Sequence, residues 1–160
     1  MSLEEKLKKI SSAKRKSDTE IDWDRRRDTW TERVGILYRD IGKWLETYIE
    51  KNYMALHFYE ITLSEEHIGK YDISVLEIDL GEPSVVFRPV GRNIIGADGR
   101  VDMYMNGRHL SDKKMLILRE DDEGRNFQWE LWETTDGKDR RPPFDREALE
   151  RTLDEWLAYY

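Results

Sequence analysis

The chain has 160 residues, no cysteine, and 27 basic side chains against 34 acidic ones, which gives a formal net charge of −7. The lack of cysteine excludes disulfides, thiolate catalysis and cysteine-ligated metal sites, and no segment approaches the ~20 apolar residues that a membrane-spanning helix needs. The N-terminal segment also lacks the apolar stretch of a signal peptide, so we expect a cytoplasmic protein.

The first sixteen residues form a basic arm. They carry six lysine and arginine side chains against Glu4 and Glu5, about +4, which leaves about −11 for the rest of the chain. Leu3, Leu7 and Ile10 have helical spacing, which predicts a short amphipathic helix that is marginal by itself. We expect a basic arm over residues 1–16 and a single α+β domain over residues 17–160.

A long helix is predicted next, over residues 18–51, and ends near Asn52. Ser17 and Glu20 have the spacing of a capping box, in which each side chain accepts from the backbone N–H of the other residue. The apolar residues that follow step by four and three positions, which averages the 3.6-residue period of an α-helix. This predicted buried face consists of Trp30, Val34, Leu37, Ile41, Trp44 and Tyr48.

Two glycines interrupt this helix on one side. Gly35 and Gly42 lie seven residues apart, and each costs about 1 kcal/mol relative to alanine in a helix interior. Their alignment indicates a close approach to the helix backbone. Packing within the monomer and a homodimer contact both remain open as its cause.

From Tyr53 onward the apolar period changes from 3.6 to 2, which predicts strands. Polar turns separate these segments, and no helical pattern lies between them, which favours an antiparallel meander of six to seven strands. We expect Asp98-Gly99 to be the turn of one hairpin. The predicted strands are residues 54–63, 71–80, 84–90, 93–97, 100–105, 114–119 and 127–133.

A second helix is predicted after Pro142-Pro143. Asp145 can cap it, and Phe144 and Leu149 have the spacing of a hydrophobic staple. The predicted fold is therefore α+β: a long N-terminal amphipathic helix, an antiparallel meander, and a C-terminal helix packed with the sheet.

Catalytic patterns are weak in this sequence. Glu77 and Asp79 share one strand face, and Glu130 lies on another strand. If these strands were neighbours, the carboxylates could hold Mg²⁺ or Mn²⁺ for a hydrolase or nuclease, with His57 as a further group. Alternating acids are also what a solvated sheet face requires, so we expect no metal and no cofactor. The remaining histidines, His67 and His109, lie in turn-like segments.

Binding residues are predicted in two places. Arg88, Arg92 and Arg100 lie close together in an otherwise acidic body and form a candidate basic surface. Trp132 falls on the strand face opposite Trp129, so it belongs to the core if a helix covers that face and to a contact surface if the face is open.

These patterns favour a non-enzymatic module that binds a partner protein. The acidic body favours a basic partner, and the glycines allow a homodimer. The sequence pI near 5.1 argues against nucleic acid as a partner. The metal-dependent hydrolase or nuclease is the alternative hypothesis.

Overall fold

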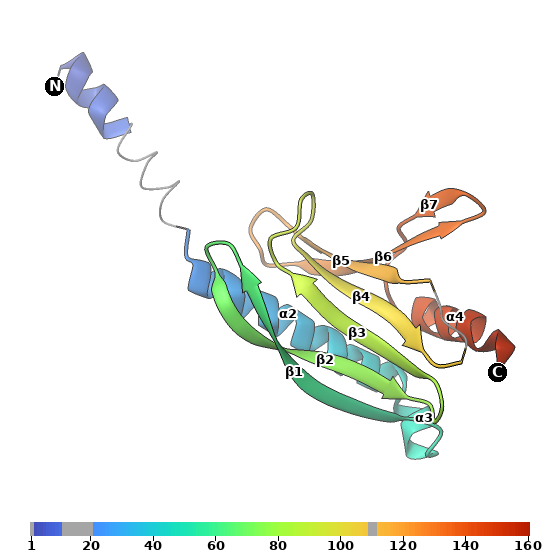
Figure 1. Cartoon of the computed structure of the whole chain (residues 1–160). Helices are drawn as coiled ribbons and strands as arrows, with labels where there is room; N and C mark the ends of the chain where they lie inside the picture. Colours follow the sequence, from blue (N-terminus) through green and yellow to red (C-terminus); the bar gives the residue numbers. More distant parts are fainter. Residues whose placement is uncertain (1, 11–20, 109–111) are drawn as a thin grey trace.

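The computed structural model describes residues 2–10, 21–108 and 112–160 (Figure 1). Its centre is a seven-stranded antiparallel sheet in which every strand pairs with the next one along the chain. Helices cover one face of this sheet, so the fold is α+β. The strands are β1 (Ala55–Glu65), β2 (Gly69–Asp79), β3 (Ser84–Gly91), β4 (Gly99–Asn106), β5 (Lys114–Glu120), β6 (Phe127–Thr135) and β7 (Lys138–Arg140).

The first helix of the chain is short and spans residues 3–10. The prediction of one long N-terminal helix over 18–51 is corrected: α2 (Trp23–Trp44) begins where the side chain of Asp22 accepts from the backbone N–H of Arg25, at 2.9 Å. Leu45, which is fully buried, leaves helical geometry and separates α2 from α3 (Glu46–Glu50). The capping box predicted at Ser17 lies outside the described residues.

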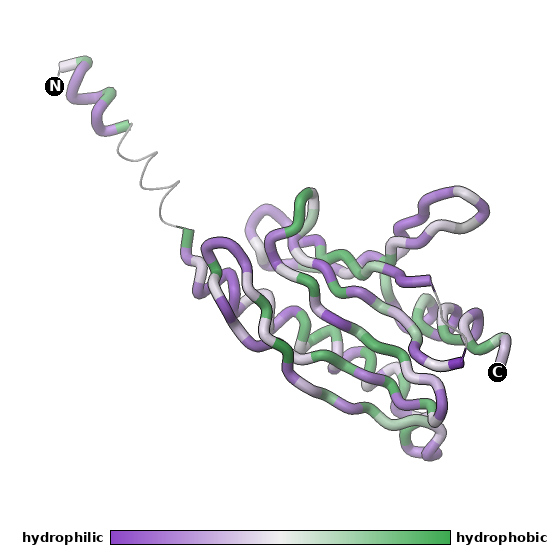
Figure 2. Tube along the Cα trace, viewed as in Figure 1, coloured by the Kyte–Doolittle hydropathy of each residue, from purple (hydrophilic) through white to green (hydrophobic). Residues whose placement is uncertain are grey.

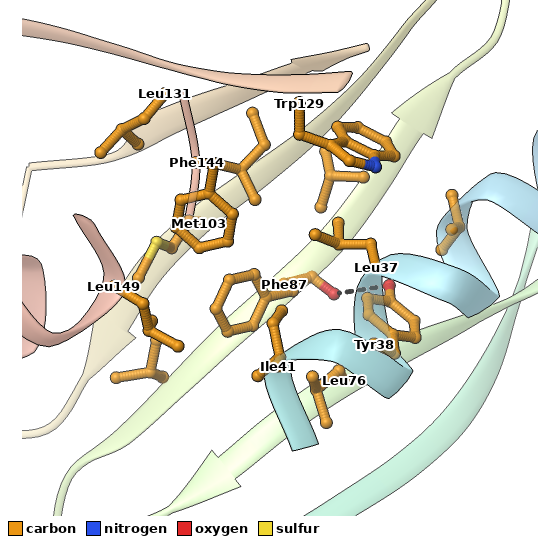
Figure 3. Close-up of a cluster of buried hydrophobic side chains, with 14 of the residues drawn as sticks. Leu37, Tyr38, Ile41, Leu76, Phe87, Met103, Trp129, Leu131, Phe144 and Leu149 are labelled. Carbon is orange, nitrogen blue, oxygen red and sulfur yellow. Dashed lines mark hydrogen bonds between the residues drawn. The ribbon is translucent and has the colours of Figure 1, made fainter. Parts of the chain in front are cut away.

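α2 packs its apolar side on the sheet. Trp30, Val34, Leu37 and Ile41 of the predicted face are buried, whereas Trp44 and Tyr48 are half-buried. Figure 3 shows Leu37 and Ile41 beside Phe87 and Leu76 of the sheet. The burial of these side chains stabilises the helix on the sheet far more than its intrinsic propensity does.

The register of the strands defines the two faces of the sheet. Residues directly opposite each other in an antiparallel pair share a face. The covered face is apolar from β2 to β6, and its core residues include Phe87, Met103 and Leu131 (Figure 3). No helix lies over the other face among the described residues (Figure 1), and we call it the open face.

Tyr38 of α2 holds the sheet where β2 and β3 separate. The ladder between these strands runs from Leu76 opposite Phe87 to Asp79 opposite Ser84. At its end the hydroxyl of Tyr38 lies 2.7 Å from the carbonyl oxygen of Ser74 and 3.2 Å from that of Phe87. Burial raises the pKa of Tyr38 far above its ordinary value, so the hydroxyl stays a donor to these carbonyls.

Two Asp-Gly pairs behave differently in this sheet. The hairpin turn predicted at Asp98-Gly99 is wrong: Gly99 begins β4, and only an isolated bridge joins Ile94 to Ala97. The reason is that Asp98 is bound to β5, accepting from the backbone N–H of Glu120 at 2.8 Å and donating its own to Leu118 at 3.0 Å.

The second pair makes the two-residue turn. Asp136 and Gly137 have positive φ angles of 54° and 73°, and they close the hairpin of β6 and the short strand β7. Positive φ at both central residues is the requirement of a type I′ turn, for which Asp-Gly is a favoured sequence.

The C-terminal helix α4 (Arg146–Trp156) covers the same face as α2 and is followed by a 3₁₀ turn, η1 (Leu157–Tyr159). Asp145 caps α4 by accepting from the backbone N–H of Ala148 at 2.9 Å. Phe144 lies between the two helices, with its ring 5.7 Å from that of Trp44. No described helix is long and apolar enough to cross a membrane.

Candidate binding surface

Three of the predicted site residues lie on the open face. Across the sheet, Arg88 of β3 is opposite Asp102 of β4, which is opposite Met115 of β5, which is opposite Trp132 of β6. Arg88 and Trp132 therefore stand in one row, three strand spacings or about 14 Å apart. Arg100 belongs to the neighbouring row of the same face.

Trp132 is surrounded by guanidinium groups. The Cζ atom of Arg141 lies 3.9 Å from the ring centroid and that of Arg119 lies 5.6 Å from it. The indole N–H points to Glu130, at 3.3 Å, and Arg119 donates to the same carboxylate at 3.0 Å. These contacts hold the half-buried ring in a fixed orientation on the sheet surface.

The carboxylates of this region are neutralised within the fold. Arg100 donates twice to Asp102, at 2.8 and 3.2 Å, and Lys113 lies 3.3 Å from the same buried carboxylate. Arg88 and Arg141 are exposed, and no carboxylate of the described residues lies within ion-pair distance of either. We define the arginine–tryptophan cluster as Arg88, Arg100, Asp102, Lys113, Arg119, Glu130, Trp132 and Arg141.

The cluster is basic although the chain is acidic. It holds five cationic side chains against two carboxylates, and the carboxylates already have cationic partners. An arginine presents a planar fork that matches a carboxylate in two parallel hydrogen bonds. The cluster is therefore suited to bind carboxylate-bearing groups next to an aromatic surface.

Arg92 lies elsewhere. Only 5% of it is exposed, and its guanidinium donates to the carbonyl of Asp98 at 2.6 Å and to the carboxylate of Glu120. Its backbone N–H donates to Glu65 at 2.8 Å. Arg92 thus joins the β3–β4 loop to β5 and to the end of β1, and it contributes nothing to the open face.

Glu65 completes this internal network. It also accepts from the backbone N–H of Asn93 at 2.8 Å and from the hydroxyl of Tyr71. Burial, together with this bond to Glu65, raises the pKa of Tyr71 above its ordinary value. The network holds the sheet together at the end nearest the start of α2.

The carboxylates considered for a metal site do not meet. Glu77 and Asp79 are on β2 and Glu130 is on β6, four strand spacings or about 19 Å away. The nitrogen Nε2 of His57 lies 3.2 Å from Asp79, and the backbone N–H of Gly81 and His57 together lower the pKa of that carboxyl. Among the described residues no three metal-ligating side chains gather.

The other two histidines add no ligand to these carboxylates in the described part of the chain. His67 stacks on Trp23 with ring centroids 4.9 Å apart, at the start of α2. His109 lies outside the described residues.

A hollow of about 1010 Å³ adjoins Trp132, between the β6–β7 hairpin and the end of the chain. Trp132, Arg141 and Lys113 belong to both the hollow and the cluster. Its walls include Lys114 and Glu133, which lie 2.9 Å apart, and Glu133 also binds Arg151 at 3.1 Å, outside the hollow. The open face thus continues into a concave surface large enough for side chains of another molecule.

Sequence reasoning missed Lys113, Arg119 and Arg141. The segment of β5 is apolar on both faces, so its alternation does not reveal on which side Arg119 lies. Arg141 follows β7 in an irregular segment, and nothing in the local sequence indicates that it reaches the ring of Trp132.

No protein-family model matches the chain, and neither a curated protein nor a solved structure matches it at significant similarity.

Proposed function

We propose that this chain is a non-enzymatic protein-binding module whose open sheet face docks an acidic segment of a partner protein. The observation that carries the proposal is the arginine–tryptophan cluster on a face that no described helix covers. Tryptophan and arginine are the residues most enriched among those that dominate the energy of protein interfaces.

The placement of the cluster supports binding. Most of its residues, Arg88, Arg100 and Trp132 among them, project from paired strands, which fix their positions more firmly than loops do. Arg88 and Arg141 have no carboxylate partner in the described chain, so a partner's carboxylates can pair with them without breaking an existing ion pair. The excess positive charge of the cluster would attract the carboxylates of a partner to this face.

The geometry gives the hydrolase or nuclease alternative no support. Glu130 already binds Arg119 and Trp132, and it is about 19 Å from the two carboxylates of β2. We therefore propose binding alone. The overall charge of the chain favours a basic partner, and we assign such a partner to a different surface, the groove between α2 and β1.

A capture experiment with matched charge reversals tests the proposal. The immobilised chain is incubated with a lysate of its host, and retained proteins are eluted with salt and identified by mass spectrometry. We expect Trp132→Ala and Arg88→Glu to lose an acidic partner that the wild type retains, with elution at moderate salt because ion pairs at the rim are screened.

The control is Lys43→Glu, which makes the same charge change at an exposed position of α2. A partner that Lys43→Glu loses as completely as Arg88→Glu would contradict docking on the open face. Retention of the same proteins by wild type and Trp132→Ala would contradict it as well.

A further inference from the structure

A groove lies between α2 and the edge strand β1, on the opposite side of the sheet from the arginine–tryptophan cluster. It encloses about 580 Å³, and its apolar lining includes Val34, Tyr38, Leu56 and Phe58. Phe58 is opposite the fully buried Leu76 in the ladder, yet 57% of it is exposed. An aromatic side chain is thus left uncovered beside the helix.

The two aligned glycines of α2 line this groove. No atom lies within 4 Å of the position that a Cβ of Gly35 would take, and for Gly42 the nearest is Cδ1 of Leu56 at 3.7 Å. Packing of the described monomer therefore leaves room over both residues. This excludes packing within the described monomer as the cause for Gly35, and contact with another chain stays a prediction.

The helix over residues 3–10 carries exposed apolar side chains that could fill such a groove. Leu3, Leu7 and Ile10 are 71%, 55% and 66% exposed, so its apolar side has no cover. In Figure 1 it lies apart from the sheet, and Figure 2 shows hydrophobic positions recurring along it between hydrophilic ones. A helix of eight residues is not stable in water by itself, so this one needs a surface to pack on.

The two surfaces match in length and in charge. Leu3 and Ile10 are seven positions apart, as are Gly35 and Gly42, which corresponds to about 10.5 Å along each helix. On the sheet side the groove is flanked by Glu60 and Asp72, which form no ion pair within the described chain, and on the helix side it is flanked by the single cation Arg39. The helix over 3–10 carries three lysines against two glutamates, so its lysines can pair with these carboxylates.

We propose that the chain forms a symmetric dimer in which the helix over 3–10 of each copy lies in the α2–β1 groove of the other. The interface is formed twice, once in each direction, as a two-fold axis requires. It gives the groove a basic amphipathic occupant and gives the short helix the apolar surface that it lacks.

Light scattering of the full chain over a concentration series tests the mass. We expect the wild type to approach twice the chain mass of 19.2 kDa, and Leu7→Asp and Gly42→Leu each to return it to the mass of one chain. Leu7 is exposed, so Leu7→Asp leaves the folded body intact, which cooperative unfolding verifies. Arg25→Leu, which adds a leucine to α2 outside the groove, is the control and should remain a dimer.

Cross-linking identifies the contact, since the chain contains no cysteine of its own. A Leu7→Cys chain is mixed with a Phe58→Cys chain and oxidised. We expect a disulfide-linked heterodimer, and none when Arg125→Cys replaces Phe58→Cys. A wild type that stays monomeric at all concentrations overturns the proposal. A dimer that survives Leu7→Asp overturns it too, as does a Leu7→Cys, Phe58→Cys double variant that closes only within one chain.

Discussion

Gly99 of β4 lies against the indole ring of Trp30 in α2 so closely that no side chain fits between them. A Cβ atom on Gly99 would lie 2.8 Å from Cε3 of Trp30 and overlap the neighbouring ring carbon. We expect Gly99→Ala to lower the free energy of unfolding by about 1–3 kcal/mol, because a buried indole of α2 would have to shift. Chemical denaturation followed by circular dichroism measures the change.

Gly35→Ala is the matched comparison, since the same methyl group meets no atom within 4 Å there. At a protein concentration low enough for the chain to be monomeric, it should raise the free energy of unfolding by up to about 1 kcal/mol, because alanine favours the helix. Equal effects of the two substitutions would contradict the packing of Gly99 on Trp30.

Tyr38 gives a prediction in alkaline solution. Tyr38→Phe removes the donor of two backbone carbonyls, and we expect it to lower the free energy of unfolding at pH 7 by about 1–3 kcal/mol. Tyr38 and Tyr71 have raised pKa values in the fold, whereas tyrosines of the unfolded chain ionise near pH 10. Above pH ~10 the folded state thus binds more protons, and its stability should fall as the pH rises.

Denaturation at several pH values between 8 and 11 checks this slope. Tyr38→Phe should lose part of the alkaline decline, while Tyr53→Phe, at an exposed position, should follow the wild type. An alkaline slope unchanged by Tyr38→Phe would rule out the buried donor role.

Two of the three arginines of the predicted basic surface should differ clearly in their effect on the free energy of unfolding. Arg92→Met leaves Glu120 without its partner inside the protein, so we expect a loss of about 3–5 kcal/mol. Arg88→Met, at an exposed position without an ion pair in the described chain, should stay within about 0.5 kcal/mol. Thermal and urea denaturation of both variants measure the two free energies of unfolding. Similar losses of stability in the two variants would show that Arg88 also supports the fold.

Asp145→Ala should weaken the C-terminal helix. It removes the acceptor for the backbone N–H of Ala148, and helix caps of this kind contribute about 0.5–2 kcal/mol. Asp154→Ala, at an exposed position within the same helix, is the control. A loss of stability no larger than that of the control would show that the cap is not needed.

Much of the fold follows from local patterns in the sequence. The change of period at Tyr53 marks the passage from helix to sheet, and Asp145 with Phe144 and Leu149 marks the last helix. The C-terminal end of α2 does not follow from the local pattern, because the apolar spacing continues through Leu45 to Tyr48 although Leu45 leaves helical geometry. The two Asp-Gly pairs carry the same local signal, and only the bonds of Asp98 to β5 decide which of them forms the tight turn.

The candidate surface was predictable only in part. Alternation in β6 places Trp132 opposite Trp129, but it cannot say which face the helices cover. Arg88, Arg92 and Arg100 are neighbours in sequence, yet burial in an ion pair removes one of them from the surface. The arginines that approach Trp132 come from β5 and from the segment after β7, and only the tertiary fold brings them together.

The contact between Trp44 and Phe144 has a consequence for how the chain is made. Each strand pairs with its neighbour in sequence, so the hairpins can form one after another as the ribosome releases them. In contrast, Trp44 at the end of α2 contacts Phe144, one hundred residues downstream, and Tyr48 contacts Glu150. These contacts can form only after the last part of the chain has been made. A nascent chain that lacks residues 144–160 therefore exposes the part of the apolar sheet face that α4 covers, and it is this late intermediate that needs protection from aggregation.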